Sequence, residues 1–195
     1  RRNRTCETKL FAAPQAEVGA SRGRSSLPAV LVVWGVWFAM AAADVWLVAR
    51  YGSNVPSWDE WDMVPTLTHE QPVTGEWLWS QHNEHRVPLP RLVFLVLHRI
   101  FGIDFRVTMY FNTLVMAALA AASIVAATRL RGRLSYSDVF FPLTLLNWGQ
   151  AVNLLWGWQL QFFTSVLLAM VALLAIALAG TGVSLSTAGI VEGVM

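Results

Sequence analysis

The chain has 195 residues, of which 55% are hydrophobic and only 13% are charged, and its mean hydropathy is +0.49. A soluble domain carries about 25% charged residues, so this composition excludes an ordinary soluble protein and indicates an integral membrane protein. The formal net charge is only +2 and no nucleic-acid-binding motif stands out, so nucleic acid is not an expected partner. The single cysteine, Cys6, excludes an internal disulfide and a cysteine-based zinc site.

The amino-terminal segment 1–26 is polar and basic, and we expect a disordered tail. By the positive-inside rule this tail predicts a cytoplasmic amino terminus. The apolar run 27–49 that follows has the length of about 20 residues that crosses a bilayer core. Its one charged residue, Asp44, either faces a polar cavity or lies at interfacial depth with a structural partner such as Arg50, and we favour the second interpretation.

The longest polar interval of the chain, 57–91, lies within a predicted extramembrane loop over 50–106. Tryptophan and tyrosine favour the membrane–water boundary, so we expect short interfacial helices in this loop, over 58–67 and 74–81. The interval holds six carboxylates, three of the four histidines and four tryptophans. We therefore predict that this loop carries the functional site.

Apolar runs predict three further spans: 107–128, 137–149 and 162–178. The middle run is short for a full crossing. Arg129, Arg131 and Arg133 follow the first run and agree with the basic tail in marking a cytoplasmic side. The large first loop, and a hairpin rich in Asn, Gln and Trp before the last span, should then face the outer side.

The expected fold is therefore all-α, a polytopic transmembrane module over 27–180 with a large outer first loop that carries short interfacial helices. We expect a multi-pass protein of the bacterial inner membrane, whose first partner is the lipid bilayer. The stretch 181–195 stays unassigned, and we expect the chain to be part of a longer protein because it begins without methionine. The oligomeric state is not predicted.

Carboxylates beside tryptophans suggest a sugar or polyol site in the first loop. Asp59 and Glu60 lie between Trp58 and Trp61; a carboxylate can accept a proton from a hydroxyl, and an indole offers an apolar face to a pyranose ring. Further candidate substrate contacts lie on the same predicted side: Glu84, Asn153 and Gln159. The alternative is that the acids are solvated loop residues beside an interfacial aromatic belt.

Histidines and arginines in the same loop offer two other kinds of site. His82 and His85 are three residues apart, which on a helix would place both imidazoles on one face, where they could bind a divalent metal ion. Hydrogen bonding within the loop, or to a phosphate together with Arg86, is the alternative that we favour. Arg86 and Arg91 could bind a lipid phosphate through bidentate hydrogen bonds, or simply contact lipid headgroups.

The layout of one basic-flanked helix, then a large outer loop with Trp58-Asp59-Glu60-Trp61, resembles the amino-terminal part of GT-C superfamily glycosyltransferases, such as protein O-mannosyltransferases and aminoarabinose transferases. The segments QHNEHRVPLPRL and NLLWGWQLQF are similar to those of uncharacterised bacterial membrane proteins, and the resemblance covers about 27–180. It implies an inverting transfer from a polyprenyl-phosphate-linked sugar to an acceptor hydroxyl. Asp59 would be the general base, Glu60 would assist or hold a metal ion, and Arg86 or Arg91 would hold the phosphate.

A second interpretation belongs to a different functional class, a non-catalytic membrane protein such as part of a transporter or an assembly subunit. The loop acids, with Arg86 and Arg91, would then bind a substrate or a partner without chemistry.

Overall fold

The structure is a computed structural model, and it describes residues 25–179 of the chain. The predicted tail 1–26 lies almost wholly outside these residues, and the stretch 181–195 lies entirely outside them. The described chain is mostly helical, with one hairpin of two very short strands. The prediction of a mostly helical fold is confirmed.

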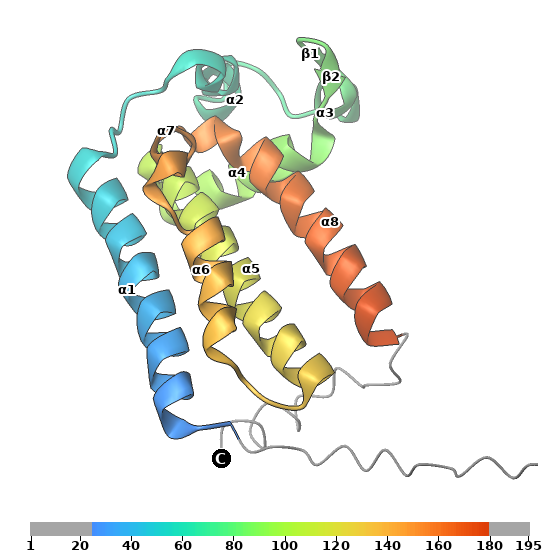
Figure 1. The fold of residues 1–195 in the computed structure, drawn as a ribbon. Helices are drawn as coiled ribbons and strands as arrows, with labels where there is room; N and C mark the ends of the chain where they lie inside the picture. The colour runs from blue at the N-terminus through green and yellow to red at the C-terminus, as the bar shows by residue number, and fades with distance from the viewer. Residues whose placement is uncertain (1–24, 180–195) are drawn as a thin grey trace, which may run out of the picture.

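Three helices are long and apolar enough to cross a membrane: α1 (Leu27–Tyr51), α5 (Arg106–Arg131) and α8 (Leu160–Ala179). They lie side by side in Figure 1, and α5 contacts both of the others. More than half (56%) of the most apolar stretch of α5 is buried, against 17% for the corresponding stretches of α1 and α8. The helix α5 is therefore the centre of the bundle, whereas α1 and α8 present most of their apolar side chains outward.

Between α5 and α8 the chain returns along the bundle as a broken helix (Figure 1). Its parts are a 3₁₀ turn Tyr136–Val139, α6 (Phe140–Leu145), a 3₁₀ turn Trp148–Gln150 and α7 (Ala151–Leu154). Asn147 makes the break, because its side chain donates to the Thr144 carbonyl (2.6 Å) and accepts from the Gly149 N–H (2.9 Å). The continuous span predicted over 137–149 is therefore not formed.

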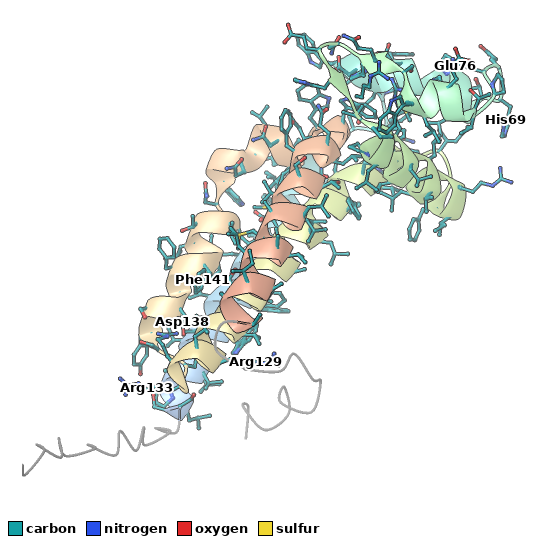
Figure 2. The ribbon with its side chains drawn as sticks, turned by 90° about the vertical axis from the view of Figure 1, so that its right-hand side faces the viewer. His69, Glu76, Arg129, Arg133, Asp138 and Phe141 are labelled. Carbon is teal, nitrogen blue, oxygen red and sulfur yellow. The ribbon has the colours of Figure 1, made fainter. Side chains whose placement is uncertain are left out.

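The basic turn and the large loop lie at opposite ends of the bundle. Figure 2 shows Arg129 and Arg133 at one end and His69 and Glu76 at the other. We call the second end, formed by residues 52–105, the loop end. The separation of the two ends agrees with the sequence-based topology, and the side of the membrane that each end faces stays a prediction.

Short elements build the loop end before the chain re-enters the bundle. They are a 3₁₀ helix Trp58–Met63, α2 (Val64–Leu67), α3 (Gly75–Trp79), β1 (Gln81–His82) and β2 (His85–Arg86). The helical elements fall within both ranges, 58–67 and 74–81, where short helices were predicted.

The helix α4 (Pro88–Phe101) follows and is amphipathic. Two prolines stand in its first turn, where their missing N–H groups cost no hydrogen bond. It ends at Gly102, whose φ of 86° is in the left-handed region that glycine tolerates. Phe94 and His98 lie on its buried face, and the opposite face exposes apolar side chains: Leu92, Val96 and Ile100.

An apolar cluster joins the loop end to the bundle: Met63, Val87, Phe94, Phe105, Trp158 and Leu160. Trp158 is fully buried and packs edge-on against Phe94, with ring centroids 5.5 Å apart. Burying a tryptophan side chain removes about 200 Å² from water, which is roughly 5 kcal/mol at 25 cal/mol per Å². Trp158 therefore fixes the 3₁₀ turn Gly157–Gln159 directly beneath the loop.

Candidate functional site

Glu60 attaches the acidic loop to the bundle. Its side chain is fully buried, and its Oε2 accepts a hydrogen bond from the Ser57 N–H at 2.7 Å, which closes a capping box at the start of the 3₁₀ helix. Its Oε1 lies against Gly157 of the turn beneath. A Cβ placed on Gly157 would be 2.5 Å from that oxygen and 2.0 Å from Thr108 Oγ1. The loop can dock here because residue 157 has no side chain.

The environment of Glu60 changes its acidity. Burial raises the pKa of its carboxyl from the usual 4.5 to about 7, and the backbone N–H groups of Ser57, Trp158 and Gly157 oppose that rise. The N–H groups of Gly157 and Trp158 lower the pKa of the Glu60 carboxyl without forming a regular hydrogen bond to it. Its Oε1 has no partner of good geometry among residues 25–179. With no access to solvent, Glu60 holds the loop in place, and its neighbour Asp59 is the acid open to a substrate.

Asp59 lies beside a buried histidine. Its Oδ2 is 3.5 Å from Nε2 of His82, and 33% of the Asp59 side chain is exposed, against 6% for His82. On the other edge of the imidazole, Oδ2 of Asp62 is 3.5 Å from Nδ1. One imidazole thus lies between two carboxylates at the surface of the loop end.

A third neighbour fixes the orientation of His82. The Trp158 Nε1–H donates to His82 Nε2 at 3.1 Å, and the two rings meet edge to face with centroids 5.1 Å apart. A neutral His82 that accepts this bond carries its proton on Nδ1, toward Asp62. Trp158 therefore holds the imidazole at the same nitrogen, Nε2, that faces Asp59.

Exposed tryptophans adjoin Asp59 in the chain. Trp58 is 81% exposed, and its φ of 50° lies in the left-handed region, which is a strained conformation for an aromatic residue. Its ring centroid is 6.3 Å from that of Trp156. Trp61 is also exposed. A strained backbone that keeps a large apolar ring in solvent is typical of a binding surface.

The two predicted phosphate-binding arginines have different environments. Arg91 is buried, and it donates to the backbone oxygens of Trp77 (2.6 Å) and Ser80 (3.0 Å) and to Ser80 Oγ (2.8 Å). Its guanidinium also stacks over the Trp77 ring. Arg91 therefore caps the end of α3 and is not directed at an open site. Arg86 is exposed, with one long contact of 3.4 Å to the Trp79 carbonyl.

The two predicted metal ligands do not share a helix face. His82 and His85 pair across the β1–β2 hairpin, whose tight turn places Asn83 at a φ of 50° and leaves Glu84 exposed. His82 is buried, whereas His85 is exposed. Within residues 25–179 no three His, Cys, Asp or Glu side chains are grouped so that they could hold a metal ion. In the described part of the chain, His82 and His85 therefore lack the third ligand that would complete a divalent metal site.

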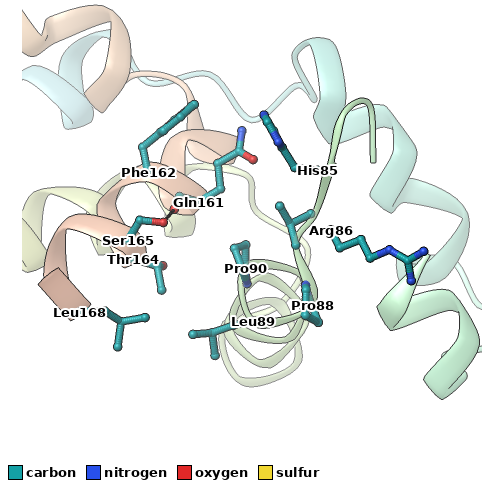
Figure 3. Close-up of a pocket in the computed structure, with 11 residues that line it drawn as sticks. His85, Arg86, Pro88, Leu89, Pro90, Gln161, Phe162, Thr164, Ser165 and Leu168 are labelled. Carbon is teal, nitrogen blue, oxygen red and sulfur yellow. Dashed lines mark hydrogen bonds between the residues drawn. The ribbon is translucent and has the colours of Figure 1, made fainter. Parts of the chain in front are cut away.

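Asn153 and Gln159 lie apart from the Asp59 cluster. With Gln150 they line a cavity of about 340 Å³ between α5, α7 and α8. A second cavity of about 330 Å³ lies between the hairpin, the start of α4 and α8 (Figure 3). Polar and apolar side chains share its wall: His85, Gln161, Ser165, Leu89, Phe162 and Leu168. Figure 3 shows that the Arg86 guanidinium extends away from this second cavity.

The structure adds residues to the site that the sequence did not indicate. Asp62 and Trp158 complete the surroundings of His82, and Gly157 and Thr108 enclose Glu60. The only available signal was the glycine between two tryptophans at 156–158. Comparisons with protein-family models, with curated proteins and with solved structures found no match to this chain.

Glu60 should make the stability of the protein depend on pH. Because its folded pKa of about 7 exceeds its usual 4.5, the folded state favours the protonated form. Its contribution is fully present below pH 4.5, is lost as the pH rises toward 7, and amounts to up to about 3 kcal/mol. Unfolding in detergent across this range should show the decline for the wild type and a flatter profile for Glu60→Gln. The exposed Glu70→Gln is the control, and a Glu60→Gln profile as steep as the wild-type one would contradict the assignment.

Gly157→Ala should displace the acidic loop. The added Cβ would meet Thr108 Oγ1 and Glu60 Oε1 well inside contact distance, and overpacking of this kind costs about 1–3 kcal/mol. The midpoint of thermal unfolding should fall, whereas Gly75→Ala, which meets nothing within 4 Å, should leave it nearly unchanged. Equal midpoints for the two variants would show that the loop does not dock on this turn.

Proposed function

We propose that this chain is a membrane-embedded glycosyltransferase of the GT-C kind, which transfers a sugar from a polyprenyl-phosphate donor to an acceptor hydroxyl at the loop end. The observation that carries the proposal is the position of Asp59. This carboxylate stands in the first loop after α1, with one side open to solvent and the other 3.5 Å from His82. A general base needs access to the reacting hydroxyl and a fixed orientation, and both conditions are met.

In the proposed step, Asp59 takes the proton of the acceptor hydroxyl while the hydroxyl oxygen attacks the anomeric carbon of the donor. The bond from that carbon to the phosphate oxygen breaks, and the polyprenyl phosphate leaves with the electron pair. Attack opposite the leaving group inverts the configuration. His82 lies between Asp59 and Asp62, whose side chain is 68% exposed, and so offers the proton a route to water.

Substrate contacts in this proposal come from the surface around Asp59. Trp58 and Trp61 offer exposed indole faces to a sugar ring. The cavity in Figure 3 combines polar groups from His85 and Gln161 with an apolar wall, which suits the phosphate and the first isoprene units of a donor. Arg86 also lines this cavity with its guanidinium turned away from it, so it would contact the phosphate only after a change of rotamer. The three long helices would cross the bilayer, with the loop end on the outer side.

Asp59→Asn should abolish sugar transfer without unfolding the protein. Removal of a general base lowers the rate by about 10²–10⁴-fold. The assay supplies proteoliposomes with undecaprenyl phosphate that carries a radiolabelled hexose, and measures the release of the label from the lipid. Glu70→Gln, an exposed acid of the same loop, is the matched control and should keep the wild-type rate. An Asp59→Asn rate equal to that of the control would remove Asp59 from the mechanism.

A specific observation also favours transport as a second function. Asp44 in α1 is fully buried, both of its carboxylate oxygens lack hydrogen-bond partners among residues 25–179, and no ion pair to Arg50 forms. The Trp148 side chain, just after the break in the returning segment, approaches it. Transporters place broken helices and buried acids at the sites where they bind ions.

Asp44→Asn separates the two functions. In an enzyme that works through Asp59, this variant should keep at least about half of the hexose-release rate, because Asp44 lies within α1 and takes no part in the proposed step, and a twofold change is only about 0.4 kcal/mol. In a transporter the wild type should release no hexose. No release by the wild type would therefore reverse the ranking of the two proposals, whereas loss of release in Asp44→Asn, with Asp59→Asn still active, would contradict the assignment of the transfer to Asp59.

A further inference from the structure

The cavity between α5, α7 and α8 is lined by neutral amides on one side and by apolar side chains on the other. Gln150, Asn153 and Gln159 supply the amides. Its apolar wall comes from α5 and α8: Met116, Phe162, Phe163 and Val166. With about 340 Å³ it is at the small end of the range of ligand sites, which is about 300–1,000 Å³.

One of these amides has no partner. The Gln159 side chain is only 8% exposed, yet it makes no hydrogen bond to any residue in the range 25–179. Asn153 Nδ2 donates to Gln150 Oε1 at 2.7 Å, which leaves the Asn153 oxygen and the Gln150 nitrogen of this cavity wall without a side-chain partner among residues 25–179. Buried polar side chains are nearly always hydrogen-bonded. The cavity therefore offers both donors and acceptors to a molecule inside it.

The chemistry of the lining restricts that molecule. Among residues 25–179, no charged side chain and no histidine lines the cavity. A charged group would lose its hydration there without an opposite charge to replace it, at a cost of several kcal/mol. A hydroxyl, which donates one hydrogen bond and accepts others, matches the amides directly.

The mouth of the cavity lies on an apolar face. Phe162 and Val166 form its rim, and they are 60% and 41% exposed. The apolar wall of the cavity extends to Met116, which lies ten residues into α5. With a rise of about 1.5 Å per residue, this position is about 15 Å from the start of α5. A polar cavity that opens through an apolar rim at this depth is reached from the lipid phase.

We propose that this cavity binds an uncharged lipid alcohol, of which diacylglycerol is the simplest example, with its hydroxyl at Gln159 and its acyl chain along Val166. The inference rests on α5 and α8 crossing a bilayer. It does not rest on sugar transfer, and neither Asp59 nor His82 takes part in it.

The test uses the whole protein in phosphatidylcholine nanodiscs that contain a small fraction of diacylglycerol with a photoreactive diazirine in one acyl chain. After irradiation and digestion, the label should map to the peptides that contain Met116 or Val166. Phosphatidic acid with the same diazirine chain carries a charged phosphate in place of the free hydroxyl, and it should label these peptides about tenfold less, which corresponds to about 1.4 kcal/mol.

Paired glutamine variants test the role of the amide. Gln159→Leu should reduce diacylglycerol labelling by about tenfold, because a buried hydrogen bond is lost. Gln161→Leu, which faces the other cavity, should label as the wild type does. Asn153→Leu, from a different helix, gives a second measurement if Gln159→Leu fails to fold, as judged by its melting temperature.

Equal labelling by diacylglycerol and phosphatidic acid, or unchanged labelling in a folded Gln159→Leu, would overturn the proposal. Hexose release by the same variants gives an independent reading. If the wild type releases no hexose, the proposal of sugar transfer is wrong, whereas the proposal of a lipid site is unaffected.

Discussion

The packing of one 3₁₀ turn, Gly157–Gln159, beneath the first loop is the contact on which the rest of the structure depends. Trp158 fills the apolar cluster under the loop and donates its N–H to His82, while Gly157 leaves room for the buried carboxyl of Glu60. Each contact alone would hold the loop weakly. Together they give Asp59 a fixed position relative to an imidazole, which an acid in a solvated loop would not have.

The same turn divides the loop end from the interior of the bundle. Above it lie the carboxylates and the imidazole, and below it lies a cavity lined by uncharged amides. This separation is physically reasonable, because ionised groups keep their hydration near the surface, whereas amides can be buried at a lower cost. The proposed sugar transfer and the proposed lipid binding therefore involve different parts of one small bundle, and each proposal can be tested separately.

The long helices could be predicted from the sequence because apolar length alone determines them, and the runs 27–49, 107–128 and 162–178 all fall within helical segments. The break in the return segment could not be predicted from the sequence. It depends on the Asn147 side chain, which bonds to the backbone of neighbouring residues in the same segment. The contacts of Arg91 and His82 could not be predicted for a related reason. Arg91 donates to the backbone at the end of α3 and His82 accepts from a tryptophan 76 positions away, which spacing does not reveal.

The order in which the chain is synthesised gives the Trp158 contact a further consequence. Proteins emerge from the ribosome amino terminus first, so the acidic loop is complete before residues 157–160 exist. Until α8 is inserted, Phe94 and Met63 lack the side chain that covers them. The loop is therefore completed later than α1 and α5, and its compactness, measured by protease resistance, reports that α8 is in place.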